Sequence, residues 1–214
     1  MPVDVWSDVV CPWCCIGRAH LKQALAEFEH GDSVEVTWRS FQLDPGAPTV
    51  ATGSLAEQLA GKFGGSPAEI EAMFAGVTAR AAAVGLDFRF DRAKSGNTVD
   101  AHRLLHLARE CGRQDALKER FFTAYFTEGE AIGDSATLAR LATQVGLDMS
   151  EVDDVLATDR YLADVGSDEA QARALQVSGV PFFVIDRRYA VAGAQPAEVL
   201  VGVLRRAWAE REAS

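Results

Sequence analysis

Apolar residues alternate with polar ones in two short segments near the start of the chain. Val3 and Val5 stand two apart in the first segment, and residues 34–38 repeat the pattern. A two-residue period places the apolar side chains on one face of a β-strand. The sequence therefore predicts two half-buried strands within the first 40 residues.

Between these strands the apolar residues recur at steps of three and four. They are Ile16, Ala19, Leu21, Ala24, Leu25 and Phe28. This spacing predicts an amphipathic helix that ends near Gly31. Pro12 suits its first turn, because a proline there loses no helical hydrogen bond. The chain is thus expected to open with a strand, a helix and a second strand.

A helical region follows the two prolines of residues 44–48, which favour a turn. Ser54 with Glu57 and Ser66 with Glu69 form two capping boxes, in which serine starts a helix and glutamate bonds back to it. Further helix starts are predicted near Asn97, Asp115, Asp134 and Ser150. About six helices fit between residues 54 and 157.

The last part of the chain combines helices with strands. Ser167 is expected to cap a helix that runs through Leu175, and residues 177–185 form an apolar, β-branched run typical of a buried strand. Residues 189–192 predict a partner strand after a short turn, and Pro196 starts a closing helix.

These elements predict an α/β fold with the order β-α-β, a large inserted helical domain, and then α-β-β-α. Residues 1–48 and 158–214 are expected to share one sheet as a discontinuous domain, with residues 49–157 as the helical insertion. The turn at Cys11 then lies at the carboxyl end of the first strand, where open α/β sheets usually carry their chemistry.

Charge and composition narrow the classes of function. The 214 residues carry a net charge of −10, which repels a nucleic-acid backbone. No apolar run reaches the roughly 18–20 residues of a membrane span. The first eight residues contain acids and no basic start, unlike a secretory signal. We therefore expect a cytoplasmic protein without nucleic-acid or membrane partners.

The cysteines carry the clearest chemical signal. Cys11 and Cys14 form a Cys-x-x-Cys pair, Cys15 follows directly, and Cys111 is distant in sequence. At a helix N-terminus the unpaired amide groups and the helix dipole favour a thiolate, which is the reactive form of cysteine. We expect Cys11 to be this thiolate and the shielded Cys14 to resolve a mixed disulfide.

A zinc site or inert buried cysteines are the alternative interpretations of this pair. Structural zinc needs four ligands, usually two close pairs. His102 and His106 are spaced for one helix face, but Cys111 is their only plausible companion in sequence. We therefore predict no metal site and favour a dithiol that cycles with a disulfide.

Two segments resemble the DsbA-like thioredoxin family, and within it the cytosolic FrnE-type branch. They are residues 7–17, which contain Cys-Pro-Trp-Cys-Cys, and residues 178–183, which contain Val-Pro-Phe-Phe. Residues 97–104 and 193–196 are also similar to that branch. The resemblance implies a thioredoxin-like fold interrupted by a helical domain, and it covers almost the whole chain.

The resemblance also implies roles for single residues. Cys11 would be the nucleophile and Cys14 the resolving thiol, with Pro181 as a cis-proline facing them. The backbone of Val180 would then pair with an extended substrate.

Pro12 and Trp13 would tune the redox couple. Trp13 replaces a histidine of the periplasmic oxidant and stabilises a thiolate less, so we expect a less oxidising couple.

Other residues near this motif have two interpretations. By the resemblance, Asn97 and His102 could overhang the cysteines in a substrate cleft, or they could simply cap and fill a helix. Asp8 is expected to hold a loop by a hydrogen bond. Cys15 and Cys111 are expected to pack as small apolar residues. The helical stripe of Phe121, Phe122, Tyr125 and Phe126 predicts core.

The sequence thus predicts an intracellular thiol–disulfide oxidoreductase acting on protein or small-molecule disulfides. It would need no bound cofactor, and glutathione or a thioredoxin-type system would recycle it. A glutathione-dependent isomerase or transferase of the hydroxychromene carboxylate or kappa type is the alternative. Those relatives usually have serine where this chain has Cys11, and a Ser-Asp or Asn-Asp pair in place of Gln195-Pro196. A chaperone-like binder is the third hypothesis.

Overall fold

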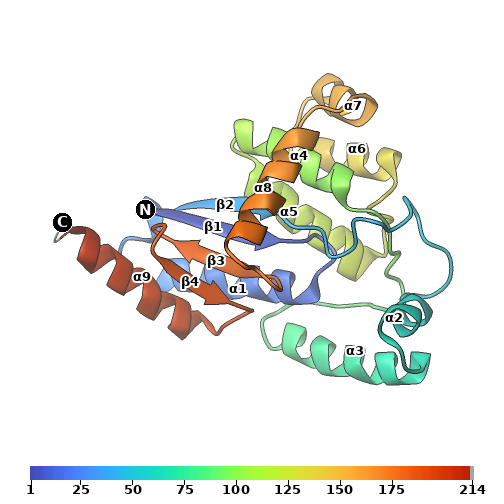
Figure 1. Cartoon of the computed structure of the whole chain (residues 1–214), viewed down its shortest axis with the longest axis horizontal. Helices are drawn as coiled ribbons and strands as arrows, with labels where there is room; N and C mark the ends of the chain where they lie inside the picture. The colour runs from blue at the N-terminus through green and yellow to red at the C-terminus, as the bar shows by residue number, and fades with distance from the viewer. Residues whose placement is uncertain (213–214) are drawn as a thin grey trace.

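A four-stranded mixed sheet is built from the two ends of the chain. Its strands are β1 (Pro2–Ser7), β2 (Glu35–Ser40), β3 (Phe182–Ile185) and β4 (Tyr189–Ala192), in the order β2-β1-β3-β4. Strand β1 runs parallel to β2 and antiparallel to β3, and β4 is antiparallel to β3. The computed structural model describes residues 1–212 and places the sheet beside a large helical region (Figure 1).

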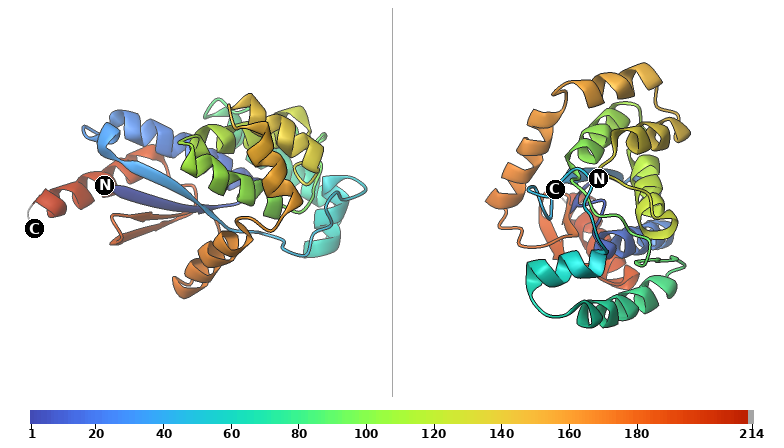
Figure 2. Two further views of the ribbon diagram at one scale, coloured as in Figure 1. Left: turned by 90° about the horizontal axis from the view of Figure 1, so that it is seen from above. Right: turned by 90° about the vertical axis from the view of Figure 1, so that its right-hand side faces the viewer.

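Helices cover both faces of this sheet. Helices α1 (Pro12–Glu27) and α9 (Ala197–Glu212) pack together on one face, while α8 (Leu162–Ala174) lies on the other (Figure 2). Val3 and Val5 of β1 point into the α1–α9 core, whereas the Trp6 indole donates to the Asp168 carbonyl on α8. Strand β1 is therefore buried on both faces, more than the half-buried strand that its alternation predicted.

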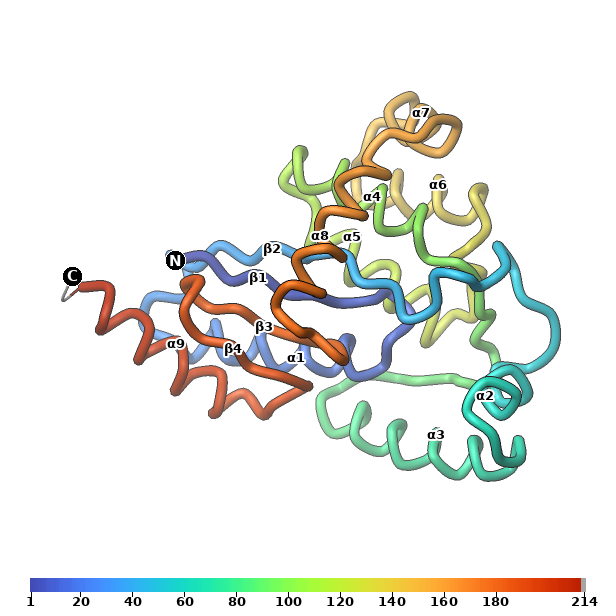
Figure 3. Tube along the Cα trace, in the orientation of Figure 1, coloured from blue at the N-terminus to red at the C-terminus, as the bar shows by residue number. Residues whose placement is uncertain are grey.

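The chain leaves the sheet after β2, forms the helical region and returns through α8 (Figure 3). The helices of this region are α2 (Leu55–Phe63), α3 (Pro67–Ala82), α4 (Val99–Glu110), α5 (Gln114–Thr123), α6 (Ser135–Gln144) and α7 (Met149–Ala157). A 3₁₀ turn at Gly31–Ser33 precedes β2, and a π-helical turn at Ala124–Glu128 follows α5. The predicted fold class is confirmed, while the domain boundaries at residues 48 and 158 stay a prediction.

A side chain at the N-cap position explains four of the helix starts, those of α2, α3, α6 and α7. Ser54 and Ser66 both accept a hydrogen bond from the amide three residues later, as the two capping boxes predicted. Helix α7 begins one residue before Ser150, near the predicted start, and Asp148 caps it, because the carboxylate accepts from two amides of the first turn. One start was predicted wrongly. Helix α8 begins five residues before Ser167, after the chain turns at Tyr161 with φ 64°.

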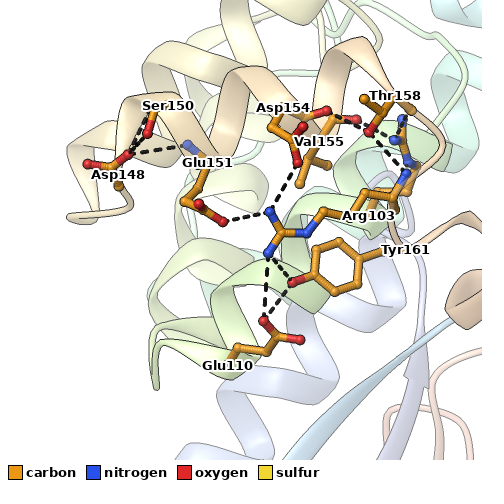
Figure 4. Close-up of polar contacts among 10 residues, drawn as sticks. Arg103, Glu110, Asp148, Ser150, Glu151, Asp154, Val155, Thr158 and Tyr161 are labelled. Carbon is orange, nitrogen blue, oxygen red and sulfur yellow. Dashed lines mark hydrogen bonds and ion pairs between the residues drawn. The ribbon is translucent and has the colours of Figure 1, made fainter.

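A buried arginine fastens α7 to α4 (Figure 4). The Arg103 guanidinium donates to the carbonyls of Val155 and Thr158 at the end of α7. These carbonyls have no partner within their own helix, so the side chain satisfies them. The hydroxyl of Tyr161 then donates to Glu110 at 2.7 Å, which fixes the start of α8 on the same helix.

Replacing Arg103 should weaken the contact between α4 and the end of α7. We expect Arg103→Ala to lower the free energy of unfolding by about 1–3 kcal/mol, because it leaves buried carbonyls without donors. Thermal denaturation measures the effect. Arg109→Ala is the matched control, since Arg109 lies on the same helix but is exposed. Equal melting temperatures for the two variants would contradict this account of Arg103.

Candidate active site

Cys11 lies at the joint between β1 and α1. It is the N-cap residue of α1, with extended backbone angles, and Pro12 occupies the first helical position. The amides of Cys14 and Cys15 both donate to the Cys11 carbonyl. The Cys11 side chain therefore stands at the helix N-terminus, at the carboxyl end of a central strand, where the sequence pattern predicted it.

A loop from the other end of the chain lies against Cys11. The Cys11 thiol donates to the Val180 carbonyl at 3.6 Å, and the Val180–Pro181 peptide bond is cis. Gly17 makes this approach possible. A Cβ atom at Gly17 would lie 2.9 Å from Pro181 Cγ and 3.4 Å from the Phe183 ring. The fold thus brings Cys11, Val180 and Pro181 together, and Gly17 is a requirement that the sequence reasoning missed.

The ionisation of the Cys11 thiol and that of the Cys14 thiol depend on each other. Burial opposes a charge on Cys14, but the adjacent Cys11 side chain and the positive charge of Lys118 hold the pKa of Cys14 below its usual value. The adjacent Cys14 side chain, together with burial, raises the pKa of Cys11 well above its usual value. Because the two groups interact closely, they titrate as one pair rather than as two independent thiols. Cys11 as the attacking thiolate stays a prediction.

Lys118 is a site residue that the sequence reasoning did not find. It is fully buried on α5, and its Nζ donates to the Ser7 carbonyl at 3.2 Å. Burial lowers the pKa of Lys118 to about 8. A signal was present in the sequence, because Lys118 shares a helical face with Phe121, Phe122 and Tyr125, which are core residues.

Asp8 holds the loop before Cys11, as expected. Its two carboxylate oxygens accept from the amides of Val9 at 2.7 Å and Leu43 at 2.8 Å. His102 Nε2 lies 3.3 Å from Asp8 Oδ1. Burial favours the neutral acid, yet the bond with His102 keeps the pKa of Asp8 below its usual value. Burial also lowers the pKa of His102, so the imidazole is neutral near pH 7.

His102 is buried and Asn97 is half-buried. His102, on α4 of the helical region, is 1% exposed. Its imidazole contacts the Asp8 carboxylate. The Asn97 amide donates to the carbonyls of Pro45 and Ala47, and its oxygen accepts from the Val99 amide at the start of α4. Asn97 therefore caps a helix and holds the loop after β2.

Trp13 faces the helical region. Its ring lies 5.3 Å from the guanidinium carbon of Arg80, which belongs to α3. This cation–π contact brings α3 beside the Cys-x-x-Cys turn.

The remaining cysteines differ from each other. Cys15 is buried, and burial raises its pKa to about 12, so it packs as a small apolar residue as expected. Cys111 was predicted to be core and is exposed. The prediction was wrong because α4 ends at Glu110, and Cys111 leaves the helical phase on which its burial depended.

Within residues 1–212, no group of three or more His, Cys, Asp or Glu side chains is placed to hold a metal ion. In the same range no helix is both long and apolar enough to cross a membrane.

The close approach at Gly17 can be tested by stability. We expect Gly17→Val to lower the free energy of unfolding by about 1–3 kcal/mol, because the new side chain overlaps Pro181. Gly202→Val on α9 is the control, since a Cβ there meets no atom within 4 Å. Chemical denaturation compares the two. A Gly17→Val variant as stable as the control would contradict the contact.

Comparisons with known proteins agree with this geometry. A probable DsbA oxidoreductase of known structure from Streptomyces coelicolor is 45% identical, with a TM-score of 0.92 over 98% of this chain and 91% of that chain. Two more distant structures share the fold. A 2-hydroxychromene-2-carboxylate isomerase is 14% identical, with a TM-score of 0.73 over 100% of this chain and 98% of that chain. The cytosolic disulfide reductase DsbM from Pseudomonas aeruginosa, described with GSH, is 17% identical, with a TM-score of 0.64 over the same shares.

A family match covers nearly the whole chain. Residues 2–205 match the DSBA-like thioredoxin domain, so both the sheet and the helical region lie inside the matched segment. The thioredoxin-like architecture of the chain agrees with this match. The chain therefore belongs to the DSBA-like thioredoxin domain family.

Proposed function

We propose that this protein is a thiol–disulfide oxidoreductase that cycles Cys11 and Cys14 between dithiol and disulfide. One observation carries the proposal. Cys11 caps α1 beside the Val180 carbonyl, while Cys14 follows one helical turn deeper. Two cysteines three residues apart at the start of a helix can form a bond without unfolding the helix.

The two cysteines take different roles in this cycle. Cys11 retains 4% exposure and Cys14 none, so a substrate sulfur meets Cys11 first. A Cys11 thiolate attacks the substrate disulfide, forms a mixed disulfide and releases one substrate thiolate. Cys14 then attacks the Cys11 sulfur, and the second substrate thiolate leaves. The Val180 backbone, which lies beside the sulfur, offers an extended edge to a peptide substrate.

Pro12 and Trp13 set the potential of the couple. The Trp13 side chain is neutral, and its ring packs against the Arg80 guanidinium. It cannot supply the positive charge that a protonated histidine would, so the couple is less oxidising than that of the periplasmic oxidant.

The cycle as proposed uses no bound cofactor. Electrons are exchanged with glutathione or a thioredoxin-type system in the cytoplasm, and substrates are protein or small-molecule disulfides. DsbM is described as a cytosolic disulfide reductase with GSH, which is consistent with this assignment at the level of the fold.

Disulfide mapping in graded glutathione buffers tests the proposal. We expect a reversible Cys11–Cys14 bond in the wild-type protein and in the Cys111→Ser control, detected by alkylation and peptide mass spectrometry. Cys11→Ser should abolish turnover, and Cys14→Ser should accumulate a mixed disulfide on Cys11. Absence of the bond across the whole buffer range, or turnover by Cys11→Ser, would exclude the proposed cycle.

A further inference from the structure

An arginine without an ionic partner lies beside the cysteine turn. Arg80 is exposed on α3, and its guanidinium carbon lies 5.3 Å from the centre of the Trp13 ring. Within residues 1–212 the guanidinium donates to no carboxylate, carbonyl or hydroxyl. A guanidinium has five N–H donors, so these donors remain available to a ligand.

The positive charge of Arg80 stands alone along its helix. Between Glu71 and Asp87 it is the single charged residue, in a chain in which 24% of the residues are charged. Helix α1 has no acidic residue in its first turn. Neither of the two helices that meet at Trp13 therefore supplies a local carboxylate to neutralise this charge.

Helix α3 places the charge at the rim of the cysteine site, since it packs against α1 (Figure 1). Val77 and Ala81, which flank Arg80 in α3, are buried in the same apolar cluster as Cys11. Arg80 itself is exposed, and Trp13 follows Cys11 by two residues in the turn. An anion bound to Arg80 would therefore lie close to the thiol that a substrate sulfur meets first.

The Trp13 ring holds the guanidinium without neutralising it. A cation–π contact restrains the planar group beside the ring but leaves its charge and its N–H edge intact. The fork of an arginine matches the two oxygens of a carboxylate, which can accept two parallel hydrogen bonds from it. Arg80 is therefore suited to bind a carboxylate that arrives from solvent.

We propose that Arg80, held against the Trp13 ring, is a specificity-determining residue that selects thiols bearing a carboxylate for reaction at Cys11. The inference rests on the proposed function and deepens it, because it names the chemical class of the small thiol. Glutathione, which has two carboxylates and a net negative charge, is the probe of this class. The protein's net charge of −10 repels such an anion, and a local cation near Cys11 offsets that repulsion where the sulfurs must meet.

The redox step balances with two molecules of glutathione. The first thiolate attacks Cys11 of the oxidised pair, so a Cys11–glutathione bond forms, the Cys11–Cys14 bond breaks and the electron pair goes to Cys14. The second thiolate attacks the glutathione sulfur of this mixed disulfide. Glutathione disulfide leaves, and Cys11 takes the electron pair. Arg80 binds a carboxylate of the first glutathione while its sulfur approaches Cys11, which lowers the barrier to the first attack.

The test compares two reducing agents of similar shape and different charge. Glutathione keeps both carboxylates, whereas glutathione diethyl ester has lost both of these charges. The measured quantity is the second-order rate constant for reduction of the oxidised cysteine pair by each thiol. We expect Arg80→Gln to slow the reaction with glutathione about fivefold, the upper end for an exposed ion pair, and to leave the rate with the diester unchanged.

Two variants separate recognition of the carboxylate from a change in net charge. Arg109→Gln removes an exposed arginine of α4 whose guanidinium also has no partner in the described part of the chain. It changes the net charge by the same amount and should keep the wild-type rates with both thiols. Arg80→Lys keeps a positive charge but loses the planar fork, so it should retain part of the preference for glutathione.

Ionic strength gives an independent check. Salt screens interactions between exposed charges, with a screening length of about 10 Å at 0.1 M. The ratio of the wild-type rate to the Arg80→Gln rate with glutathione should therefore fall toward one as salt is added. Repulsion by the net charge acts nearly equally on both proteins, so it cancels from this ratio.

The outcomes separate this inference from the proposed function. If the wild-type protein forms no Cys11–Cys14 disulfide, the proposed function fails and the inference falls with it. If the disulfide forms and Arg80→Gln reacts with glutathione at the wild-type rate, Arg80 does not recognise the carboxylate and the inference alone is wrong. An equal loss of rate with glutathione and with the diester overturns it as well, because that loss would not depend on the carboxylates.

Discussion

The contact between Arg18 and Asp115 is the constraint on which the rest of the site depends. It joins the catalytic helix α1 to α5 of the helical region, which the sequence separates by about a hundred residues. Asp115 also accepts from the Trp38 indole at 3.0 Å, so β2 is tied to the same point. Because a guanidinium and a carboxylate match in only a few orientations, this contact sets register as well as proximity.

The site contains two buried charged side chains, and each has hydrogen-bond partners close by. Asp8 and Lys118 are both enclosed, and each would be costly to bury alone. Asp8 accepts from two backbone amides and His102, while Lys118 donates to the Ser7 carbonyl. Both buried charges therefore have hydrogen-bond partners within the site.

The fold by itself does not choose the reaction. A disulfide reductase and an isomerase share this architecture at low sequence identity, so the chemistry must come from residues placed on it. In the proposed cycle of this chain, Cys11 and Cys14 are the two residues that supply it. The helical region places two cations near their turn, since Arg80 contacts the Trp13 ring and Lys118 donates to the Ser7 carbonyl.

The sequence by itself determined the features that a few neighbouring residues encode. The strand-to-helix joint at Cys11, the proline at the first helical position and the two serine capping boxes each depend on local hydrogen bonds or periodicity. Only the tertiary structure decided that Lys118, about a hundred residues further along the chain, is buried beside this joint and donates to the Ser7 carbonyl. It also decided that His102 supports Asp8 and that Cys111 is exposed. Burial and electrostatic interactions depend on the distances between groups that are far apart in the sequence. A local pattern of residues along the chain does not determine those distances.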